Sequence, residues 1–236
     1  MKPTNQQTSF KLSLQGMALV NSSQAITMNR GFSFESKDGV AGIYREIVSS
    51  KSIPLMRLDN FRRAGEKARL AMLGSMLALA DAGSSTGGST AIIGWGGEES
   101  MTENRAYFTD YAVNGRFLGR SQLFIGTLPS TPLCEAAICL NLHGPVYYFQ
   151  SDGGLNAVLA EAESLLSSQP AGQALLLGIS SGELLALLLE QSGDKHDFSQ
   201  LMQIEDMSGI YHHLKEKFSG TENLNRQSTI SAGRNT

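Results

Sequence analysis

The residues of this chain that could perform chemistry lie between Tyr147 and Leu166, in the stretch YYFQSDGGLNAVLAEAESLL. Its aromatic start predicts a strand and its apolar end predicts a helix, and the two meet at a short polar corner. Five residues form this corner: Gln150, Ser151, Asp152, Gly153 and Gly154. A side chain at such a corner faces the free N–H groups and the positive end of the helix dipole, which stabilise an anion. The corner could therefore present a nucleophile.

Ser151 is the nucleophile that this corner offers, but the sequence provides no evident general base for it. A serine hydroxyl needs such a base, whereas a cysteine thiol at a helix N-terminus is activated by a lowered pKa. His143 comes before the strand, which spans about 16 Å at 3.3 Å per residue, and the other histidines fall in the weakly patterned tail. The hydrolase motif G-x-S-x-G is not met, because Phe149 replaces its first glycine. Capping of the helix by Ser151 or Asp152 is favoured because such caps are common, and a small serine hydrolase or acyltransferase using Ser151 stays open as the alternative.

The elements on either side of the corner must hold it in place. We predict a strand over Val146–Gln150 and a second strand over Ala174–Ile179. Between them, six apolar residues recur at helical spacing: Leu155, Val158, Leu159, Ala162, Leu165 and Leu166. This strand–helix–strand order predicts an α/β domain, with a layered βαβ mixed sheet packed by helices.

The rest of the chain adds further elements to this domain. We predict a strand over Phe10–Val20, loop with short elements over Asn21–Ser52, and a helix over Phe61–Ala82. From Ala68 to Ala80 this helix is apolar nearly all round, which predicts a core helix packed on both sides. A buried strand follows at Thr90–Trp95, with helices at Glu98–Val113 and Pro132–Leu142. The predicted organisation is one domain over residues 10–192, a helical extension over 193–218 with its helix from Ile204, and a disordered tail over 219–236.

Composition and charge narrow the classes of function. The 236 residues are 41% apolar and 17% charged, which is typical of a soluble globular protein, and the net charge of −3 argues against a nucleic-acid binder. The basic cluster Arg62, Arg63, Lys67 and Arg69 is either a solvated helix face or a patch for an acidic partner.

The cysteine content and the apolar runs indicate the cellular location of the protein and whether it binds a metal or spans a membrane. Cys134 and Cys139 are spaced for neither a metal pair nor a disulfide, so we expect small buried side chains. Few cysteines and no apolar export segment predict a cytoplasmic location. The longest apolar run, Leu184–Leu189, is too short for a membrane span. We expect no metal and no cofactor.

Five features, in this order, resemble the first half of the β-ketoacyl synthases of the thiolase fold. They are the helix Phe61–Ala82, the strand Ala91–Gly97 with its glycines, the segment Phe124–Pro132, the helix ending in Leu140–Pro145, and the corner at 147–158. In that family an L-x-G-P motif precedes the strand that carries the active-site cysteine, and Leu142-His143-Gly144-Pro145 matches it. The resemblance covers roughly residues 10–192 and implies half of a thiolase-like fold.

Two departures from the family imply that this chain does not catalyse condensation by itself. Ser151 stands where the family has its cysteine, and the two catalytic histidines of the family come from a second half that the chain is too short to build. The pattern is similar to the chain-length-factor subunits that pair with active ketosynthases in polyketide and aryl-polyene pathways. The resemblance implies a non-catalytic subunit in a heterodimer with a full-length ketosynthase, which meets an acyl carrier protein through the complex during fatty-acid or polyketide-type elongation.

The resemblance also implies two sites. The strand residues Val146, Tyr147, Tyr148 and Phe149 correspond to the family's dimer interface. The aromatic residues Tyr107, Phe108, Tyr111 and Phe124 correspond to the region where the non-catalytic subunit closes its partner's acyl tunnel. For each of these four aromatic residues, a place in the hydrophobic core is an equally good interpretation. A scaffold protein that keeps only the half-fold and binds no acyl chain is a further alternative.

Overall fold

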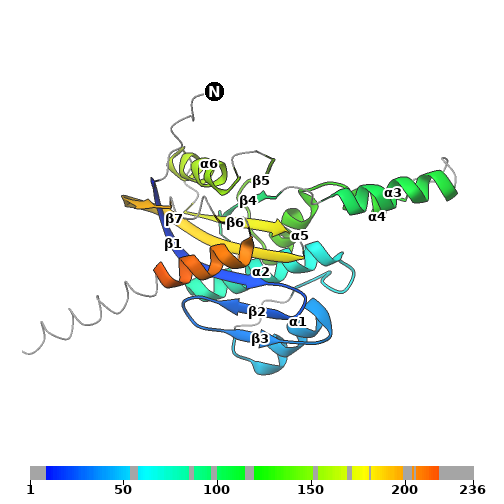
Figure 1. Cartoon of the computed structure of the whole chain (residues 1–236), viewed down its shortest axis with the longest axis horizontal. Coiled ribbons are helices and arrows are strands. Elements are labelled where there is room, and N and C mark those ends of the chain that lie inside the picture. Colours follow the sequence, from blue (N-terminus) through cyan, green and yellow to red (C-terminus); the bar gives the residue numbers. More distant parts are fainter. Residues whose placement is uncertain are drawn as a thin grey trace, which may run out of the picture.

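The computed structural model describes residues 9–53, 58–84, 88–96, 100–114, 120–150, 154–168, 172–180, 182–198, 204 and 206–217 (Figure 1). In chain order its elements are β1 (Ser9–Val20), β2 (Gln24–Thr27), β3 (Ser33–Glu35), α1 (Gly39–Ser50), α2 (Glu66–Ala82), β4 (Ala91–Trp95), α3 (Met101–Asn114), α4 (Ser121–Gly126), α5 (Thr131–Leu140), β5 (Val146–Phe149), α6 (Gly154–Ser168), β6 (Gln173–Ser180) and β7 (Glu183–Asp197). Residues 207–217 form a further helix.

The strands form one mixed sheet in the order β3-β2-β1-β7-β6-β4-β5. β4 lies between β5 and β6 and runs parallel to both, while the remaining neighbours are antiparallel. The predicted strand–helix–strand unit is therefore present as β5, α6 and β6, and its crossover passes over β4. This order leaves β5 at one edge of the sheet.

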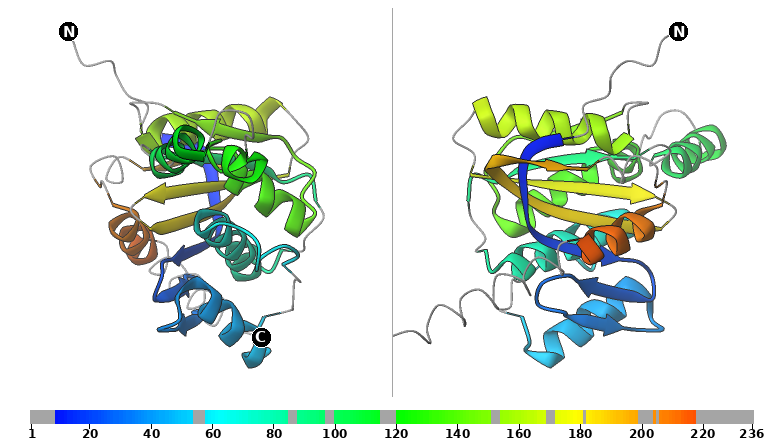
Figure 2. Two further views of the ribbon diagram at one scale, coloured as in Figure 1. Left: turned by 90° about the vertical axis from the view of Figure 1, so that its right-hand side faces the viewer. Right: turned by 60° about the vertical axis from the view of Figure 1, so that its left-hand side comes forward.

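Helices cover both faces of the central strands, so the molecule has two hydrophobic cores (Figure 2). The first core lies between the sheet and α1, α2 and α5, and the second lies between the sheet, α6 and the helix at 207–217. Alternate strand residues point to opposite faces, so Leu175 belongs to the first core and Leu176 to the second. A strand covered on both faces reads as a continuous apolar run, which explains Leu184–Leu189 in β7.

The helix α2 is the buried helix that the sequence predicts. Every residue from Leu70 to Asp81 is buried, including the carboxylate of Asp81. This carboxylate accepts hydrogen bonds from the backbone N–H groups of Met17 at 3.0 Å, Asn29 at 3.1 Å and Arg30 at 2.8 Å. Because three donors satisfy it, Asp81 can be buried, and it joins the end of α2 to β1 and to the segment after β2.

Three element predictions need correction. The predicted helix Phe61–Ala82 begins only at Glu66, because Asn60 has a positive φ of 64° and accepts turn hydrogen bonds from Arg63 and Ala64. The segment Asn21–Ser52, predicted as loop with short elements, does contain the short strands β2 and β3, but also the longer, 12-residue helix α1. The short helix α4 is also absent from the prediction.

The segment after Ser192 joins the same fold. Residues 193–197 continue β7, and are not part of a helical extension, because they pair with the start of β1 at Ser9↔Asp197 and Phe10↔His196. The predicted helix from Ile204 is present at 207–217, where Tyr211 is fully buried in the second core. The predicted disordered tail at 219–236 lies outside the described residues.

Candidate functional site

The strand-to-helix corner is described only at its two flanks. Gln150 is exposed after β5, and Gly154 begins α6 with a positive φ of 53°, which favours glycine. Ser151, Asp152 and Gly153 lie outside the described residues, so capping and nucleophilic roles at these positions stay predictions. His143 is exposed before the start of β5, where its backbone N–H donates to the Gly88 carbonyl. It therefore lies at the opposite end of this four-residue strand from the corner.

The four predicted interface residues lie together on the edge strand β5. One side of β5 pairs with β4, from Ile92↔Val146 to Trp95↔Phe149. Its other side has no neighbour among the described strands. Tyr147 is 40% exposed, and Val146, Tyr148 and Phe149 are half-buried. An edge of this kind offers its N–H and C=O groups to a strand from another chain.

A helical arm extends from the body beside this edge (Figure 1). We define the arm as α3 and α4; α3 follows β4, the neighbour of β5. No residue of α3 is buried. The arm is held together by an aromatic cluster, in which Tyr107 stacks on Tyr111 at 6.2 Å and meets Phe124 edge-on at 5.8 Å between ring centroids. Asp110 and Arg120 add an ion pair at 3.5 Å.

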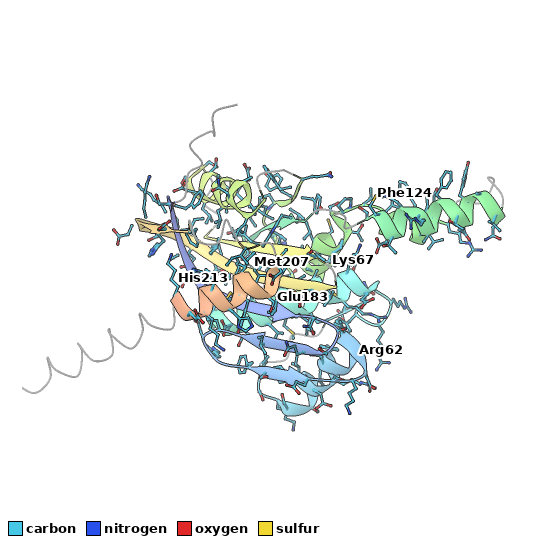
Figure 3. The ribbon with its side chains drawn as sticks, viewed as in Figure 1. Arg62, Lys67, Phe124, Glu183, Met207 and His213 are labelled. Carbon is cyan, nitrogen blue, oxygen red and sulfur yellow. The ribbon has the colours of Figure 1, made fainter. Side chains whose placement is uncertain are left out.

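The structure separates the four aromatic residues that the family resemblance singles out. Tyr107, Tyr111 and Phe124 form the cluster within the arm, whereas Phe108 is 71% exposed. The interpretation as core aromatics is wrong, because none of the four lies in either hydrophobic core. Figure 3 labels Phe124 on the arm, away from the sheet. Further large apolar residues are exposed on the arm and just after it: Met101, Val113, Ile125 and Leu128.

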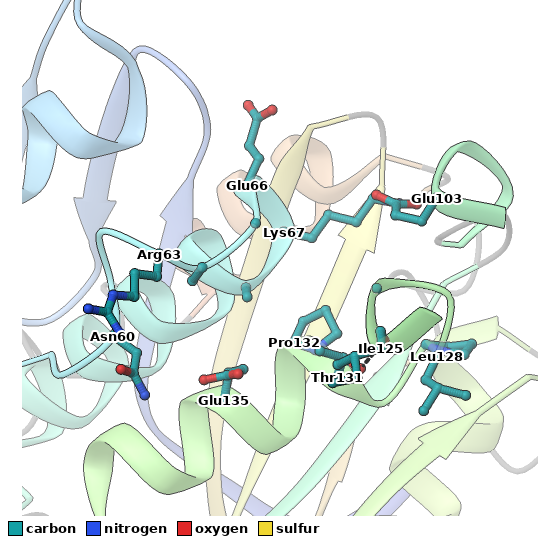
Figure 4. A pocket seen from close by; sticks show the side chains of 15 residues that line it. Asn60, Arg63, Glu66, Lys67, Glu103, Ile125, Leu128, Thr131, Pro132 and Glu135 are labelled. Atoms are coloured by element: carbon teal, nitrogen blue, oxygen red, sulfur yellow. Dashed lines mark hydrogen bonds and ion pairs between the residues drawn. The ribbon is translucent and has the colours of Figure 1, made fainter. Parts of the chain in front are cut away.

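A cavity of about 370 Å³ lies at the joint between the arm and the body (Figure 4). Its walls come from the start of α2, the start of α3, the segment after α4, and α5. Lys67 of α2 crosses the joint and pairs with Glu103 of α3, with 2.9 Å between Nζ and Oε2. One end of the cavity is polar, with Asn60, Arg63 and Glu135, and the other end combines the Lys67–Glu103 pair with apolar side chains such as Ile125 and Leu128.

Contacts within the chain account for two of the four residues of the basic cluster. Lys67 pairs with Glu103, and the Arg69 guanidinium donates to the backbone carbonyls of Phe61 and Arg62. These two side chains therefore have structural contacts within the chain. Arg62 and Arg63 are exposed, so the choice between a solvated face and a patch for an acidic partner concerns only these two.

The cysteines differ from the prediction of two small buried side chains. Cys134 is exposed and Cys139 is half-buried on α5, and both are free thiols. The Cys139 thiol donates to the Asp59 carbonyl. Burial, followed by the negative charges of Glu135 and Asp59, raises the pKa of Cys139 to about 11, so its thiolate is scarce near neutral pH. Neither thiol has the lowered pKa of a catalytic cysteine, because burial also raises the pKa of Cys134.

Two absences hold for the described part of the chain. No group of three or more His, Cys, Asp and Glu side chains there could hold a metal ion. No helix there is both long and apolar enough to cross a membrane.

Comparisons with known proteins give matches in structure alone. No protein family profile matches the chain, and no curated protein matches its sequence. The structure is similar to a β-ketoacyl synthase from Burkholderia phymatum, with a TM-score of 0.50, 16% identity, and 77% of this chain matching 59% of that one. It is also similar to a chain of the ketosynthase and chain length factor complex from Xenorhabdus doucetiae, with a TM-score of 0.54, 14% identity, and coverage of 78% and 81%. The chain has the ketosynthase fold.

The chain spans less than two thirds of two of these structural neighbours. The ishigamide ketosynthase/chain length factor matches with a TM-score of 0.51 and 15% identity over 81% of this chain, but over only 64% of the neighbour. These likenesses confirm the predicted α/β, thiolase-like fold. Since the identities are low, they concern the fold and not the chemistry.

Sequence reasoning missed the arm as a projecting unit and the ion pair at its base. The sequence does contain a signal for the arm. The apolar residues of Met101–Asn114 are scattered around the helix and form no stripe that could face a core. The ion pair joins residues 36 positions apart, and no local pattern indicates it.

Proposed function

We propose that this ketosynthase-like chain is a non-catalytic, chain-length-factor-like subunit. It pairs with a full-length β-ketoacyl-acyl carrier protein synthase and helps to shape the acyl tunnel of that partner during fatty-acid or polyketide-type chain elongation. Pairing with the partner brings it to the acyl carrier protein. The partner supplies the nucleophile and the histidines, since Ser151 takes the cysteine position in this chain.

The observation that carries this proposal is the arm next to an open sheet edge. Phe108 is 71% exposed and Val113 is 76% exposed on a helix with no buried residue. Large apolar side chains in such a position expose surface that a partner protein would cover. Because α3 follows β4 and β4 pairs with β5, the arm begins beside the edge strand β5, whose outer side has no neighbour among the described strands.

The two features would contact the partner in different ways. The edge of β5 would pair with a strand of the ketosynthase, so that backbone hydrogen bonds align the two subunits. The arm would reach across this interface, and Phe108 would enter the partner's acyl tunnel. The cluster of Tyr107, Tyr111 and Phe124 would hold the arm rigid and so fix the depth of Phe108.

Replacing Phe108 by alanine tests whether this side chain limits the acyl chain. The variant is co-expressed with the ketosynthase, and the lengths of the acyl products are measured by mass spectrometry. Removing an aromatic ring from the end of a tunnel should lengthen the products, while the two subunits still purify together.

A matched control is Val48→Ala, which also shortens an exposed apolar side chain but lies on α1, away from the arm. It should leave product length unchanged. Unchanged product length in Phe108→Ala, with the complex intact, would favour the alternative of a scaffold subunit that contacts no acyl chain.

A further inference from the structure

Among the described residues, few contacts join the arm to the rest of the fold. α3 has no buried residue, and the aromatic cluster joins α3 to α4 but not to the body. The Thr131 hydroxyl donates to the Ile125 carbonyl at 2.6 Å, which ties the end of α4 to the start of α5. The cavity of about 370 Å³ separates the base of the arm from α2 and α5. Packing therefore leaves room for the arm to pivot at this joint.

The ion pair between Lys67 and Glu103 spans this joint (Figure 4). Both side chains are largely removed from solvent, with 29% and 31% of their surface exposed, so water screens the pair less than it screens a surface pair. Glu103 stands in the first turn of α3, where the helix dipole favours a carboxylate.

The position of Lys67 is unusual, because it is the second residue of α2. A cation in the first turn of a helix is disfavoured by the helix dipole. Gly65 at the N-cap provides no side-chain cap that would offset this cost. The carboxylate of Glu66 points in another direction than the Lys67 side chain, which runs toward Glu103 (Figure 4). Glu103 is therefore the carboxylate that compensates Lys67.

We propose that Lys67 and Glu103 form an electrostatic latch that sets the angle of the arm. They are positioning residues: they touch no acyl chain, but determine where Phe108 lies relative to β5. The latch is a property of the isolated chain. Its use in setting product length rests on the function proposed above.

The test measures the arm angle in the full chain without a partner. Spin labels are attached through Thr109→Cys on the arm and Ser164→Cys on α6, both exposed positions, with Cys134 and Cys139 replaced by serine. Pulsed electron paramagnetic resonance then gives the distribution of distances between the labels. Lys67→Gln and Glu103→Gln should each shift and broaden this distribution, and the charge-exchanged pair Lys67→Glu with Glu103→Lys should restore it.

A control variant, Arg45→Gln, breaks the exposed Arg45–Asp38 ion pair beside α1 and should leave the distribution unchanged. The latch is refuted if neither glutamine variant changes the distribution. It is equally refuted if the charge-exchanged pair stays as broad as the single variants, because side-chain packing and not charge would then hold the arm. Product length is measured separately with the ketosynthase present. If the distances respond and the products do not, the latch stands and its role in setting product length is refuted.

Discussion

At the scale of single residues, Tyr211 shows how the C-terminal helix is held. Its ring is fully buried in the second core, and its hydroxyl has no hydrogen-bond partner among the described groups. Burial, together with the negative charge of Asp81, raises the pKa of Tyr211 to about 12. The ring stabilises the fold, whereas the buried hydroxyl costs free energy.

Two substitutions at Tyr211 should therefore have different effects on stability. Tyr211→Ala leaves a cavity and should lower the free energy of unfolding by about 3–5 kcal/mol. Tyr211→Phe keeps the ring and removes the unsatisfied hydroxyl, so it should be neutral or stabilising by about 1 kcal/mol. Urea unfolding at neutral pH measures both. A large loss of stability in Tyr211→Phe would mean that the hydroxyl makes an essential contact.

The pKa of Tyr211 also predicts how stability depends on pH. A group whose pKa is higher in the folded state than its ordinary value of 10 stabilises the fold fully below pH 10, and this contribution is lost as the pH rises toward 12. The free energy of unfolding of the natural chain should therefore fall more steeply between pH 10 and pH 12 than that of Tyr211→Phe. Identical pH profiles for the two chains would show that the tyrosine titrates normally.

At the scale of elements, β1 and α2 approach so closely at Gly16 that no larger residue fits. A Cβ atom at this position would lie 2.3 Å from the Ala78 carbonyl oxygen and 2.8 Å from the Ala82 backbone nitrogen. Both are backbone atoms of α2 and cannot move aside alone. Gly16→Ala should therefore lower the free energy of unfolding by about 2 kcal/mol or more.

Gly193 of β7 offers the matched control for this prediction, because a Cβ atom there would meet no atom within 4 Å. Gly193→Ala should change the free energy of unfolding by less than about 0.5 kcal/mol. Thermal unfolding followed by circular dichroism compares the two variants. Equal stabilities would contradict the close packing of β1 on α2.

The edge strand β5 gives a prediction about assembly. Tyr147→Lys places a charge on an edge that natural proteins often protect with lysine. Since Tyr147 is 40% exposed, the stability of the isolated chain should change by less than about 0.5 kcal/mol. Co-purification with the ketosynthase should be lost, whereas Tyr147→Phe should retain it. Normal co-purification of Tyr147→Lys would exclude β5 as the interface.

The elements differ in how well the sequence predicts them. The six apolar residues predicted for the helix after the corner are the six buried residues of α6, because one stripe faces one sheet. The helix α1 has a similar signal in Val40, Ile43 and Ile47, but the polar residues around it obscure the pattern. The continuation of β7 through residues 193–197 depends on pairing with Ser9 and Phe10, which local sequence cannot indicate.

The candidate site was predictable only in part. The family resemblance places the interface on Val146–Phe149, and the structure adds that this strand is an edge, which follows from the sheet order and not from local sequence. The family resemblance also selects four aromatic residues as one group: Tyr107, Phe108, Tyr111 and Phe124. Their different environments depend on the packing of α3 against α4, because only Phe108 lies outside the aromatic cluster.

At the scale of the whole molecule, helices of the described chain cover both faces of the central strands, but nothing described covers the arm or the outer side of β5. α6 and the helix at 207–217 cover one face, and α1, α2 and α5 cover the other. The chain therefore has complete cores of its own, and we expect it to fold without a partner. The arm and β5 remain exposed and lie next to each other, and together they are the surface that we assign to a ketosynthase.

Native mass spectrometry of this chain, co-expressed with a full-length ketosynthase from the same source, tests that assignment most directly. The main species should have the summed mass of one ketosynthase and one 25.4 kDa chain, and this pair should perform condensation that neither protein performs alone. A ketosynthase that forms only its own active homodimer, with this chain present as a separate species, would contradict the proposed function.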